Sequence, residues 1–379
     1  MRLLHVIPTY LPATRYGGPI YSVHGLCKAL VRAGHEVHVF TTSVNGENDS
    51  QVKHGVPVEL DGVTVWYFQS WLLRRLYYAP DMKSVLANKI SEFDIVHLHS
   101  VFLWPTFMAA GLAFKNNIPY LLSPRGMLVG ELLRRKNYLL KYLWIMLFER
   151  RNIRHAAGLH VTSSIELKEI SSLGLDLVPA HIIANGCDVP DTLENGNRQN
   201  VKPYALYLGR INWKKRLDRL IDAWQKVSGL DLLIAGPDDE NYSQMLMERI
   251  RVHNLSDRIT LMGEVSGNEK WPLFANARLF ILPSISENFG NVVLEAMVRG
   301  CPVIVTDGVG LAEEVKKNQA GLVIDGSIES ISSSVNQLNQ DREAHDSMGQ
   351  NGRHLAMTKY SWDVIAKDMV ATYQKILNQ

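Results

Sequence analysis

The feature that most constrains the fold of this chain is a regular alternation of short apolar runs with helical patterns. Apolar runs occupy residues 3–7, 36–41, 63–68, 94–99 and 120–123 of the first half, and 204–208, 230–235, 259–261, 277–282 and 302–306 of the second. Short buried strands that alternate with helices are typical of parallel, doubly wound sheets. We therefore predict an α/β protein with two Rossmann-like domains.

A polar stretch separates the two series of strands. Residues 191–203 have no periodic apolar pattern and contain the run Glu194-Asn195-Gly196-Asn197. Such a segment is typical of an interdomain linker, so we predict a first domain at 1–190 and a second at 204–358. Near the end of the chain, residues 362–377 have the pattern of an amphipathic helix.

The composition is that of a soluble enzyme and argues against several other classes. The 379 residues are enough for two domain cores, and the net charge of only +2 gives no case for nucleic-acid binding. Three widely spaced cysteines fit neither a disulfide framework nor a zinc site. The N-terminus lacks a signal-peptide pattern and no apolar run reaches membrane-spanning length, so we expect a cytoplasmic protein.

Two glutamates flank a strand-to-helix loop in the second half. Glu287 follows the predicted strand 277–282, and Glu295 lies about one turn into the helix predicted at 291–299. The residues between them include Asn288, Phe289, Gly290 and Asn291. Amides at a helix N-terminus bind anions and hydroxyls, and each carboxylate accepts two hydroxyl hydrogen bonds. The pattern therefore favours a polyhydroxylated ligand, although glutamates near a helix start also serve simply to offset the helix dipole.

A basic loop follows the first strand of the second half. Gly209 ends that strand, and Arg210 and Lys215 come after it. A glycine lets a ligand approach the backbone, while the arginine fork and the lysine point charge both suit phosphate. Anionic cofactors bind at this edge of a parallel sheet, but a solvated basic turn has the same pattern.

The first half offers weaker candidates. Gly17 and Gly18 precede a helix predicted at 21–33 and are suited to bring a phosphate against main-chain amides, although no G-x-G-x-x-G fingerprint follows the first strand. His97 and His99 end the strand 94–99, and we expect them to point to opposite faces, with His99 towards a cleft. Without a nearby cysteine or third ligand, they do not indicate a metal site.

Taken in order, these residues resemble the retaining glycosyltransferases of family 4, which have the GT-B architecture. Further segments that match the family are Ile183-Ala184-Asn185-Gly186-Cys187-Asp188, Ala235-Gly236-Pro237, Pro283-Ser284, Ala296-Met297 and Gly300-Cys301-Pro302-Val303-Ile304. The resemblance covers essentially the whole chain and is strongest in the second half. It implies an acceptor-side domain at 1–190, a nucleotide-sugar-binding domain at 204–358 facing it across a cleft, and a final helical segment, 359–379, that packs on the first domain.

The resemblance also implies roles for the candidate residues of the second half. Arg210 and Lys215, beside Gly209, would bind the donor diphosphate and stabilise the charge that develops as it leaves. Glu287 would bind hydroxyls of the donor sugar, with help from the loop 288–291, and Glu295 would bind the ribose. No protein nucleophile and no metal cofactor are expected, because in this family the leaving diphosphate takes the acceptor's proton.

In the first half, the resemblance implies that Gly17 and Gly18 lie against the diphosphate. The first half also departs from the family pattern at one position. Many members carry a histidine after the strand that ends here at Ser123, where this chain has Arg125. An arginine cannot act as a base, so we expect Arg125 to bind the donor phosphate or an acidic acceptor. His99 is then the candidate for contact with the sugar near the reacting carbon.

The resulting prediction is a hexosyltransferase that moves a hexose from a nucleotide sugar to a glycan or lipid-linked glycan in surface polysaccharide biosynthesis. UDP-glucose is the first candidate donor and GDP-mannose the second. A glycosidase also uses two carboxylates, but the basic loop disfavours it. A nucleotide-sugar epimerase and a non-catalytic sugar-nucleotide-binding protein remain open as alternatives.

An aromatic, apolar and basic segment at 132–148 has two interpretations. It lies within a stretch, 72–154, that holds 13 Lys/Arg and 5 Asp/Glu. One interpretation is a helix on the inner face of the plasma membrane, close to a lipid-linked acceptor. The other is a core helix whose Lys and Arg side chains extend to solvent.

Overall fold

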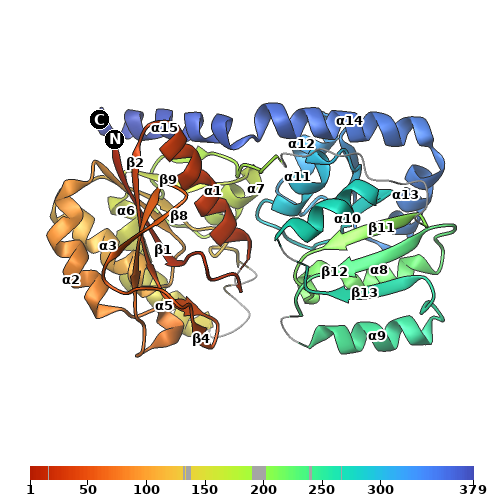
Figure 1. Cartoon of the computed structure of the whole chain (residues 1–379), viewed down its shortest axis with the longest axis horizontal. Helices are drawn as coiled ribbons and strands as arrows, with labels where there is room; N and C mark the ends of the chain where they lie inside the picture. The colour runs from red at the N-terminus through yellow and green to blue at the C-terminus, as the bar shows by residue number, and fades with distance from the viewer. Residues whose placement is uncertain (16, 131–132, 134–137, 190–201, 239–240, 266) are drawn as a thin grey trace. The chain divides into compact units, whose positions relative to one another are not determined.

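The computed structural model describes residues 1–15, 17–130, 133, 138–189, 202–238, 241–265 and 267–379. They form two compact units (Figure 1). Unit 1 comprises Met1–Gly186 and Trp362–Gln379, and unit 2 comprises Cys187–Ser361. The chain thus changes unit after residues 186 and 361, where the sequence analysis placed the boundaries at 190 and 358. All but the last two residues of the predicted linker, 191–203, lie outside the described residues.

Unit 1 is built on an eight-stranded sheet of order β10-β9-β8-β7-β1-β2-β6-β5. Its strands are β1 (Arg2–Thr9), β2 (Glu36–Thr42), β5 (Pro57–Leu60), β6 (Val63–Phe68), β7 (Ile95–His99), β8 (Tyr120–Ser123), β9 (Gly158–Val161) and β10 (Ala180–Ile182). Neighbouring strands are parallel except for β5 and β6, which form an antiparallel hairpin at the edge. The chain leaves β1 towards β2 and later returns on the other side with β7, so the β1–β7 boundary is a topological switch point.

Helices cover both faces of this sheet. They are α1 (Gly18–Arg32), α2 (Pro80–Lys89), α3 (Trp104–Lys115), α5 (Tyr138–Trp144), α6 (Arg150–His155), α7 (Ser164–Ser171) and α15 (Trp362–Leu377). Alternate residues of β1 enter two separate cores: Leu3 packs with side chains of α1 and α15, and Leu4 with those of α2 and α3. A strand that is buried on both faces has a continuous apolar sequence, and this pattern is the reason that β1 could be predicted.

The C-terminal helix α15 packs beside α1 in unit 1. Its first residue, Trp362, lies against two glycines. A Cβ atom added to Gly25 would lie 2.3 Å from the indole ring, and one added to Gly186 would lie 2.4 Å from it. The two glycines therefore make room for the tryptophan that begins the helix.

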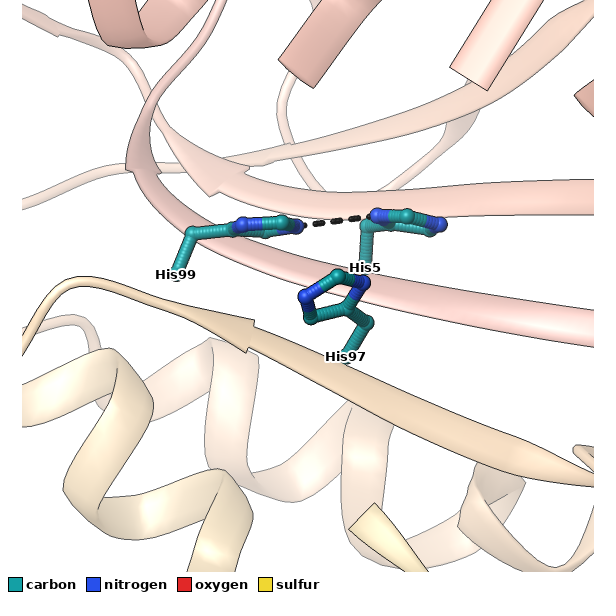
Figure 2. A group of neighbouring side chains, drawn as sticks. All are labelled: His5, His97 and His99. Atoms are coloured by element: carbon teal, nitrogen blue, oxygen red, sulfur yellow. Dashed lines mark hydrogen bonds between the residues drawn. The ribbon is translucent and has the colours of Figure 1, made fainter. Parts of the chain in front are cut away.

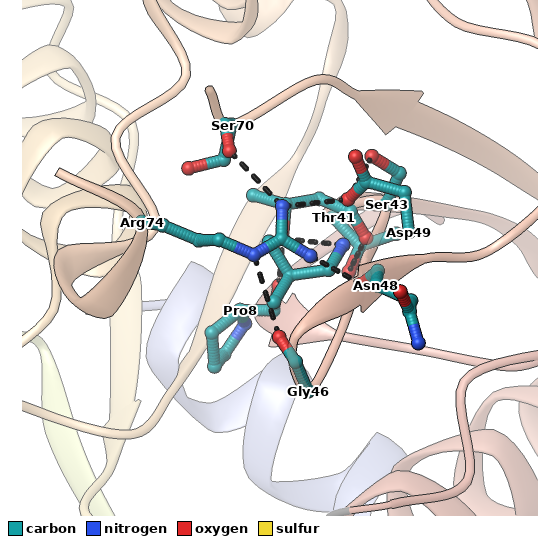
Figure 3. Close-up of polar contacts among 10 residues, drawn as sticks. Pro8, Thr41, Ser43, Gly46, Asn48, Asp49, Ser70 and Arg74 are labelled. Atoms are coloured by element: carbon teal, nitrogen blue, oxygen red, sulfur yellow. Dashed lines mark hydrogen bonds and ion pairs between the residues drawn. The ribbon is translucent and has the colours of Figure 1, made fainter. Parts of the chain in front are cut away.

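A small antiparallel hairpin, β3 (Val44–Asn45) and β4 (Asn48–Asp49), follows β2. Figure 3 shows the arginine that holds it. The Arg74 guanidinium donates to the Asp49 carboxylate at 2.9 Å and to the carbonyls of Gly46 and Ser70 at 3.3 Å. One side chain thus ties the hairpin to the segment that follows β6.

Unit 2 is built on a six-stranded parallel sheet of order β13-β12-β11-β14-β15-β16. Its strands are β11 (Tyr204–Leu208), β12 (Asp231–Ala235), β13 (Ile259–Gly263), β14 (Leu279–Leu282), β15 (Val303–Thr306) and β16 (Gly321–Ile324). Its helices are α8 (Leu217–Trp224), α9 (Tyr242–Val252), α10 (Lys270–Asn276), α11 (Asn291–Val298), α12 (Ala312–Lys317), α13 (Ile328–Gln340) and α14 (Arg342–Lys359). The order reverses between β11 and β14, which is the switch point of this unit.

The two sheets confirm the prediction of two doubly wound α/β units. The sequence analysis did not list β16 or the outer strands β9 and β10. Each of these strands has only three or four residues. Among the described residues, no helix combines the length and the apolar character needed to cross a membrane.

Candidate active site

Two glycines end the adjacent strands β11 and β12 at the switch point of unit 2. Gly209 and Gly236 have φ values of 155° and 141°. A Cβ atom on Gly236 would lie 1.9 Å from the carbonyl oxygen of Gly209, so no other residue fits there. The backbones of Gly209 and Gly236 therefore lie in direct contact where the two parallel strands end.

The basic loop is held at both ends by hydrogen bonds. The side-chain oxygen of Asn212 accepts from the amide of Lys214 at 3.1 Å and caps the short turn Trp213–Lys215. The Lys214 carbonyl then accepts from the amide of Ile285, just after β14, at 2.8 Å. The basic loop is thereby joined to the loop that carries Glu287.

Lys215 and Glu287 meet at the junction of these loops. The Lys215 ammonium contacts the Glu287 carboxylate, and the two side chains are 12% and 27% exposed. A cation suited to phosphate and a carboxylate suited to sugar hydroxyls thus lie side by side at the carboxyl edge of the sheet. Arg210, in the same loop, is exposed, and its carbonyl accepts from the Tyr207 hydroxyl at 2.9 Å.

A third loop fixes the backbone of Glu287. The Glu287 amide donates to the carbonyl of Gly308, and the Gly310 amide donates to the carbonyl of Glu287, both at 2.9 Å. A Cβ atom on Gly308 would lie 2.0 Å from the carbonyl of Ile285, and one on Gly310 would lie 2.2 Å from that of Asn288. The sequence analysis missed this loop, although the spacing of its two glycines is the available signal.

The helix α11 begins directly after the loop of Glu287. Gly290 takes the left-handed conformation at φ 97° and precedes Asn291, the first helical residue. Phe289 is buried, and its ring packs edge-on against Tyr360 at a centroid distance of 6.1 Å. The amides of the first turn of α11 thus begin beside Glu287, where they suit a hydroxyl or an anionic oxygen.

Glu295, on α11, forms a second lysine–glutamate pair. The Lys270 ammonium at the start of α10 lies 2.8 Å from its carboxylate, and the two side chains are 24% and 21% exposed. Burial raises the pKa of Glu295, and the charge of Lys270 opposes that rise. Lys270 was not a candidate from the sequence, because the chain places it 25 residues from its partner.

In unit 1, Gly17 and Gly18 lie at the N-terminus of α1. Gly17 has a φ of 63° and supplies no side-chain cap to the helix, and Gly18 is the first helical residue. They follow β1, which borders the switch point of this sheet. The structure therefore places them where a doubly wound sheet binds ligands.

The expectation that His97 and His99 point to opposite faces is wrong. Figure 2 shows both rings on one side of the sheet together with His5 from β1. The rings of His97 and His99 are 4.2 Å apart between centroids, and His5 is in register with His97. Residues two positions apart share a face of a strand. All three side chains are buried, and the side chain of His99 is 0% exposed.

The partners of these histidines determine which ring nitrogen carries hydrogen. Arg125 can only donate, so His99 Nδ1 accepts from its Nη2 at 3.2 Å. His99 Nε2 then carries the hydrogen and donates to His5 Nδ1 at 2.9 Å. The result is a directed chain of hydrogen bonds from Arg125 through His99 to His5.

A second chain of hydrogen bonds runs through His97, whose ring contacts those of His5 and His99. His160 Nε2 lies 2.9 Å from the carbonyl of Ile183 and must donate to it, so His160 Nδ1 accepts from His97 Nε2 at 3.2 Å. His97 Nδ1 then accepts from the Tyr373 hydroxyl of α15 at 2.7 Å. Burial lowers the pKa of His5 and His160 to about 3, and those of His97 and His99 well below the ordinary value. The four histidines are therefore neutral at neutral pH.

His5, His97 and His99 bring three imidazoles within reach of one another, and their nearest ligand atoms all lie within 4.8 Å. His5 is the third ligand that the sequence analysis did not find. The hydrogen-bond directions nevertheless do not fit a metal ion. Ligation through His99 Nε2 would place a hydrogen on Nδ1, which accepts from Arg125, and ligation through Nδ1 would place the ion beside that guanidinium.

Comparisons with known proteins agree with this architecture. The model of the family described as "Glycosyl transferases group 1" matches residues 189–355, and that of "Glycosyl transferase 4-like domain" matches residues 17–186. An uncharacterized glycosyltransferase of Methanocaldococcus jannaschii is 26% identical over 96% of this chain and 95% of its own.

Two solved structures are similar over the full length. Sucrose-phosphate synthase from Thermosynechococcus elongatus superposes with a TM-score of 0.79 at 18% identity, covering 100% of this chain and 99% of its own. Anabaena HepE, solved in complex with UDP and glucose, has a TM-score of 0.77 at 18% identity, covering 99% and 100%. These likenesses show that the fold is GT-B.

Proposed function

The chain belongs to the glycosyl transferases group 1 family, with a 4-like domain in its first half, and we propose that it is a retaining hexosyltransferase that uses a nucleotide sugar. The contact between Lys215 and Glu287 is the observation that carries this proposal. A diphosphate needs cations, and a sugar needs hydroxyl acceptors. The pair presents one of each at the place where two strand-to-helix loops meet.

The proposed reaction places charge where these residues can stabilise it. As the bond between the sugar and the diphosphate breaks, negative charge grows on the leaving phosphate, and Lys215 and Arg210 stabilise it. Fixed cations act most strongly on charge that develops in the transition state. Glu287 holds the sugar hydroxyls, Glu295 the ribose, and the departing diphosphate takes the proton of the acceptor hydroxyl. These roles involve no metal ion, and we propose a metal-independent reaction.

UDP-glucose is the donor that we propose, with GDP-mannose as the alternative. This choice is supported by HepE, which shares the fold and was solved with UDP and glucose, and by the frequency of UDP-sugars as donors in the family. The proposed acceptor is a glycan or lipid-linked glycan of surface polysaccharide biosynthesis, met at the cytoplasmic face of the membrane.

An exposed apolar surface in unit 1 supports the membrane part of this proposal. Most of residues 132–137 lie outside the described residues, but α5 and the π-helical turn Ile145–Glu149 that follows it are described. The large apolar residues that they expose are Leu139, Leu140, Tyr142, Leu143, Met146 and Leu147. A core helix would bury these side chains, so the interpretation of 132–148 as a core helix fails for this part.

Binding and turnover experiments on the full chain test the donor site. Thermal shifts with UDP-glucose, GDP-mannose, UDP and GDP identify the base, because a ligand that binds only the folded state raises Tm. We expect stabilisation by UDP-glucose, and its loss in Lys215→Ala. The neighbouring Lys214→Ala is the matched control, because the Lys214 ammonium lies over the Trp213 ring. Equal stabilisation of wild type and Lys215→Ala by every nucleotide would refute this site.

The alternatives predict different products. An epimerase would convert the donor sugar when no acceptor is present, and a binding protein would bind UDP without turnover. Incubation of wild type with labelled UDP-glucose, with and without a lipid extract as acceptor, separates the three. A labelled glycolipid that forms only with the extract is the outcome expected of a transferase.

A further inference from the structure

Arg125 stands at the carboxyl edge of the unit 1 sheet, beside its switch point. It follows β8, whose last residue, Ser123, is in register with His99 at the end of β7. Its φ of 55° is in the left-handed region, which a residue other than glycine enters only when its surroundings hold it there. Such backbone strain is frequent at functional sites.

The turn at Arg125 is held by a buried carboxylate. The Glu166 carboxylate accepts from the amide of Gly126 at 2.7 Å, and from the amide and hydroxyl of Thr162 at 2.7 and 3.0 Å. Glu166 therefore orients the backbone of the turn. Burial lowers the pKa of Arg125 to about 10, and the charge of Glu166 opposes that shift. The hydrogen bonds of the buried Glu166 carboxylate thus fix the position of Arg125 in unit 1.

Neutral acceptors hold the guanidinium itself. Its Nε and Nη2 lie 3.4 and 3.2 Å from His99 Nδ1, and its Nη1 lies 2.9 Å from the side-chain oxygen of Asn185. These contacts use three of the five N–H groups of an arginine. Within the described residues, two N–H groups are left over, and none of the partners is a carboxylate.

We propose that Arg125 binds an oxyanion of the nucleotide-sugar donor and that His99 and His5 are positioning residues that hold its guanidinium. The inference rests on the proposed function. A fixed guanidinium with unused donors and only neutral partners matches a phosphate or a carboxylate. The oxyanion is either the donor diphosphate or a carboxylate on the transferred sugar.

His99 acts through Arg125 in this arrangement. Its side chain is fully buried, Nδ1 accepts from Arg125, and Nε2 donates to His5. Because both ring nitrogens are occupied by protein, a direct contact with the sugar, as the sequence analysis expected, would require one of these hydrogen bonds to break. The neutral His5 ring orients His99, and His99 supplies the acceptor that Arg125 needs.

Calorimetric titration of the full chain with UDP, UDP-glucose and UDP-glucuronic acid tests the role of Arg125. Arg125→Ala is expected to weaken binding by about tenfold or more, the usual effect of losing hydrogen bonds to a charged group. A loss of affinity shared by all three ligands would show that Arg125 binds the diphosphate. A loss of affinity confined to UDP-glucuronic acid would show that it binds a carboxylate on the sugar. Dissociation constants within about twofold of wild type for all three would overturn the proposal.

Arg125→Lys and Arg154→Ala complete this comparison. Arg125→Lys keeps the charge without the guanidinium fork, so its dissociation constants should lie between those of wild type and Arg125→Ala. The lysine variant replaces the alanine variant in this test if Arg125→Ala does not fold. Arg154, exposed and paired with Asp176, should give wild-type constants. Unchanged binding in Arg125→Ala while Lys215→Ala loses the ligand would reject this inference alone. Failure of wild type to bind any nucleotide sugar would reject the proposed function as well.

The positioning role has its own test. His99→Gln keeps one acceptor and one donor and should stay near wild type, whereas His99→Phe should reproduce much of the loss of Arg125→Ala. In the Arg125→Ala background, His99→Phe should then add less than about twofold, because coupled residues are not additive. A full additional loss in the double variant would show that His99 does not act through Arg125.

Discussion

The Lys215 ammonium touches the Glu287 carboxylate, although the two residues belong to different strand-to-helix loops 72 positions apart in the chain. Their loops leave β11 and β14, the two strands between which the order of the unit 2 sheet reverses. The contact therefore places opposite charges at the position where a doubly wound sheet binds its ligand. This relationship makes the proposed donor site testable by single substitutions.

Charge removal at this pair should abolish transfer without unfolding the protein. We expect Lys215→Ala to lower kcat by about 100-fold or more, the usual effect of losing a group that stabilises developing charge. Glu287→Gln should also lower kcat strongly, because the donor sugar loses its charged hydroxyl acceptor. Steady-state kinetics with UDP-glucose measure the effect, and Lys214→Ala is the control. Near-normal kcat in both variants, with unchanged Tm, would be incompatible with the site.

Lys270 should control the ionisation of Glu295. Burial raises the pKa of Glu295 and Lys270 opposes that rise, so Lys270→Met should raise the pKa further. Donor binding that needs the carboxylate is lost as pH falls, and in Lys270→Met this loss should begin at a higher pH than in wild type. Titration of UDP binding between pH 7.5 and about 5 measures the shift. Lys226→Met, which removes an exposed partner of Glu329, should leave the curve in place.

The close approach of Gly236 to the Gly209 carbonyl should tolerate only glycine at position 236. Gly236→Ala would bring a methyl group to 1.9 Å from the Gly209 carbonyl, and we expect it to destabilise unit 2 by about 2–4 kcal/mol. Gly229→Ala is a matched control, because Gly229 also has a positive φ, 65°, but a Cβ there meets nothing within 4 Å. Urea unfolding should therefore show a much smaller decrease in the free energy of unfolding, about 1 kcal/mol, for Gly229→Ala. Equal losses would mean that the positive φ, and not the close approach of the two backbones, sets the cost of the substitution.

The buried histidines should make unit 1 sensitive to acid. Burial lowers the pKa of His5 and His160 from 6.5 to about 3, so below pH 6.5 the unfolded chain binds protons that the folded chain does not. The stability that is present above pH 6.5 is then lost as pH falls towards 3, by about 1.4 kcal/mol per pH unit for each group.

Urea titrations at pH 7, 6 and 5 measure this slope. His160→Gln removes one of the titrating groups. It should reduce the slope of the free energy of unfolding against pH by about the contribution of one histidine. His354→Gln, at an exposed position on α14, should not. A wild-type free energy of unfolding that does not change between pH 7 and 5 would contradict the neutral network.

The exposed apolar surface of α5 should bind anionic membranes. Vesicle flotation is expected to recover wild type with anionic lipid at low salt, and Leu139→Ser/Leu143→Ser/Leu147→Ser should reduce recovery because apolar burial drives interfacial binding. Met247→Ser/Val252→Ser, which removes exposed apolar groups from α9 of unit 2, is the control. Wild type that stays in the soluble fraction at low salt would remove the membrane contact from the proposal.

The local pattern of the chain was sufficient to predict the main strands, the doubly wound class and the loops that carry Gly209, Lys215 and Glu287. These features follow from the period of apolar residues and from the residue types at strand ends, and both are properties of neighbouring positions. The resemblance to family 4 added the order of the motifs. Neither could supply the pairing of Lys270 with Glu295, because that contact depends on how α10 and α11 pack.

The tertiary structure alone decided the surroundings of His99 and Glu287. Three histidines meet because β1 and β7 are neighbours in the sheet, and the directions of their hydrogen bonds follow from Arg125 and the Ile183 carbonyl. Glu287 is fixed by a loop that follows β15, the next strand of its sheet. Amino-acid sequence encodes local conformation directly, but side chains from distant positions come together only when strand order and helix packing place them there.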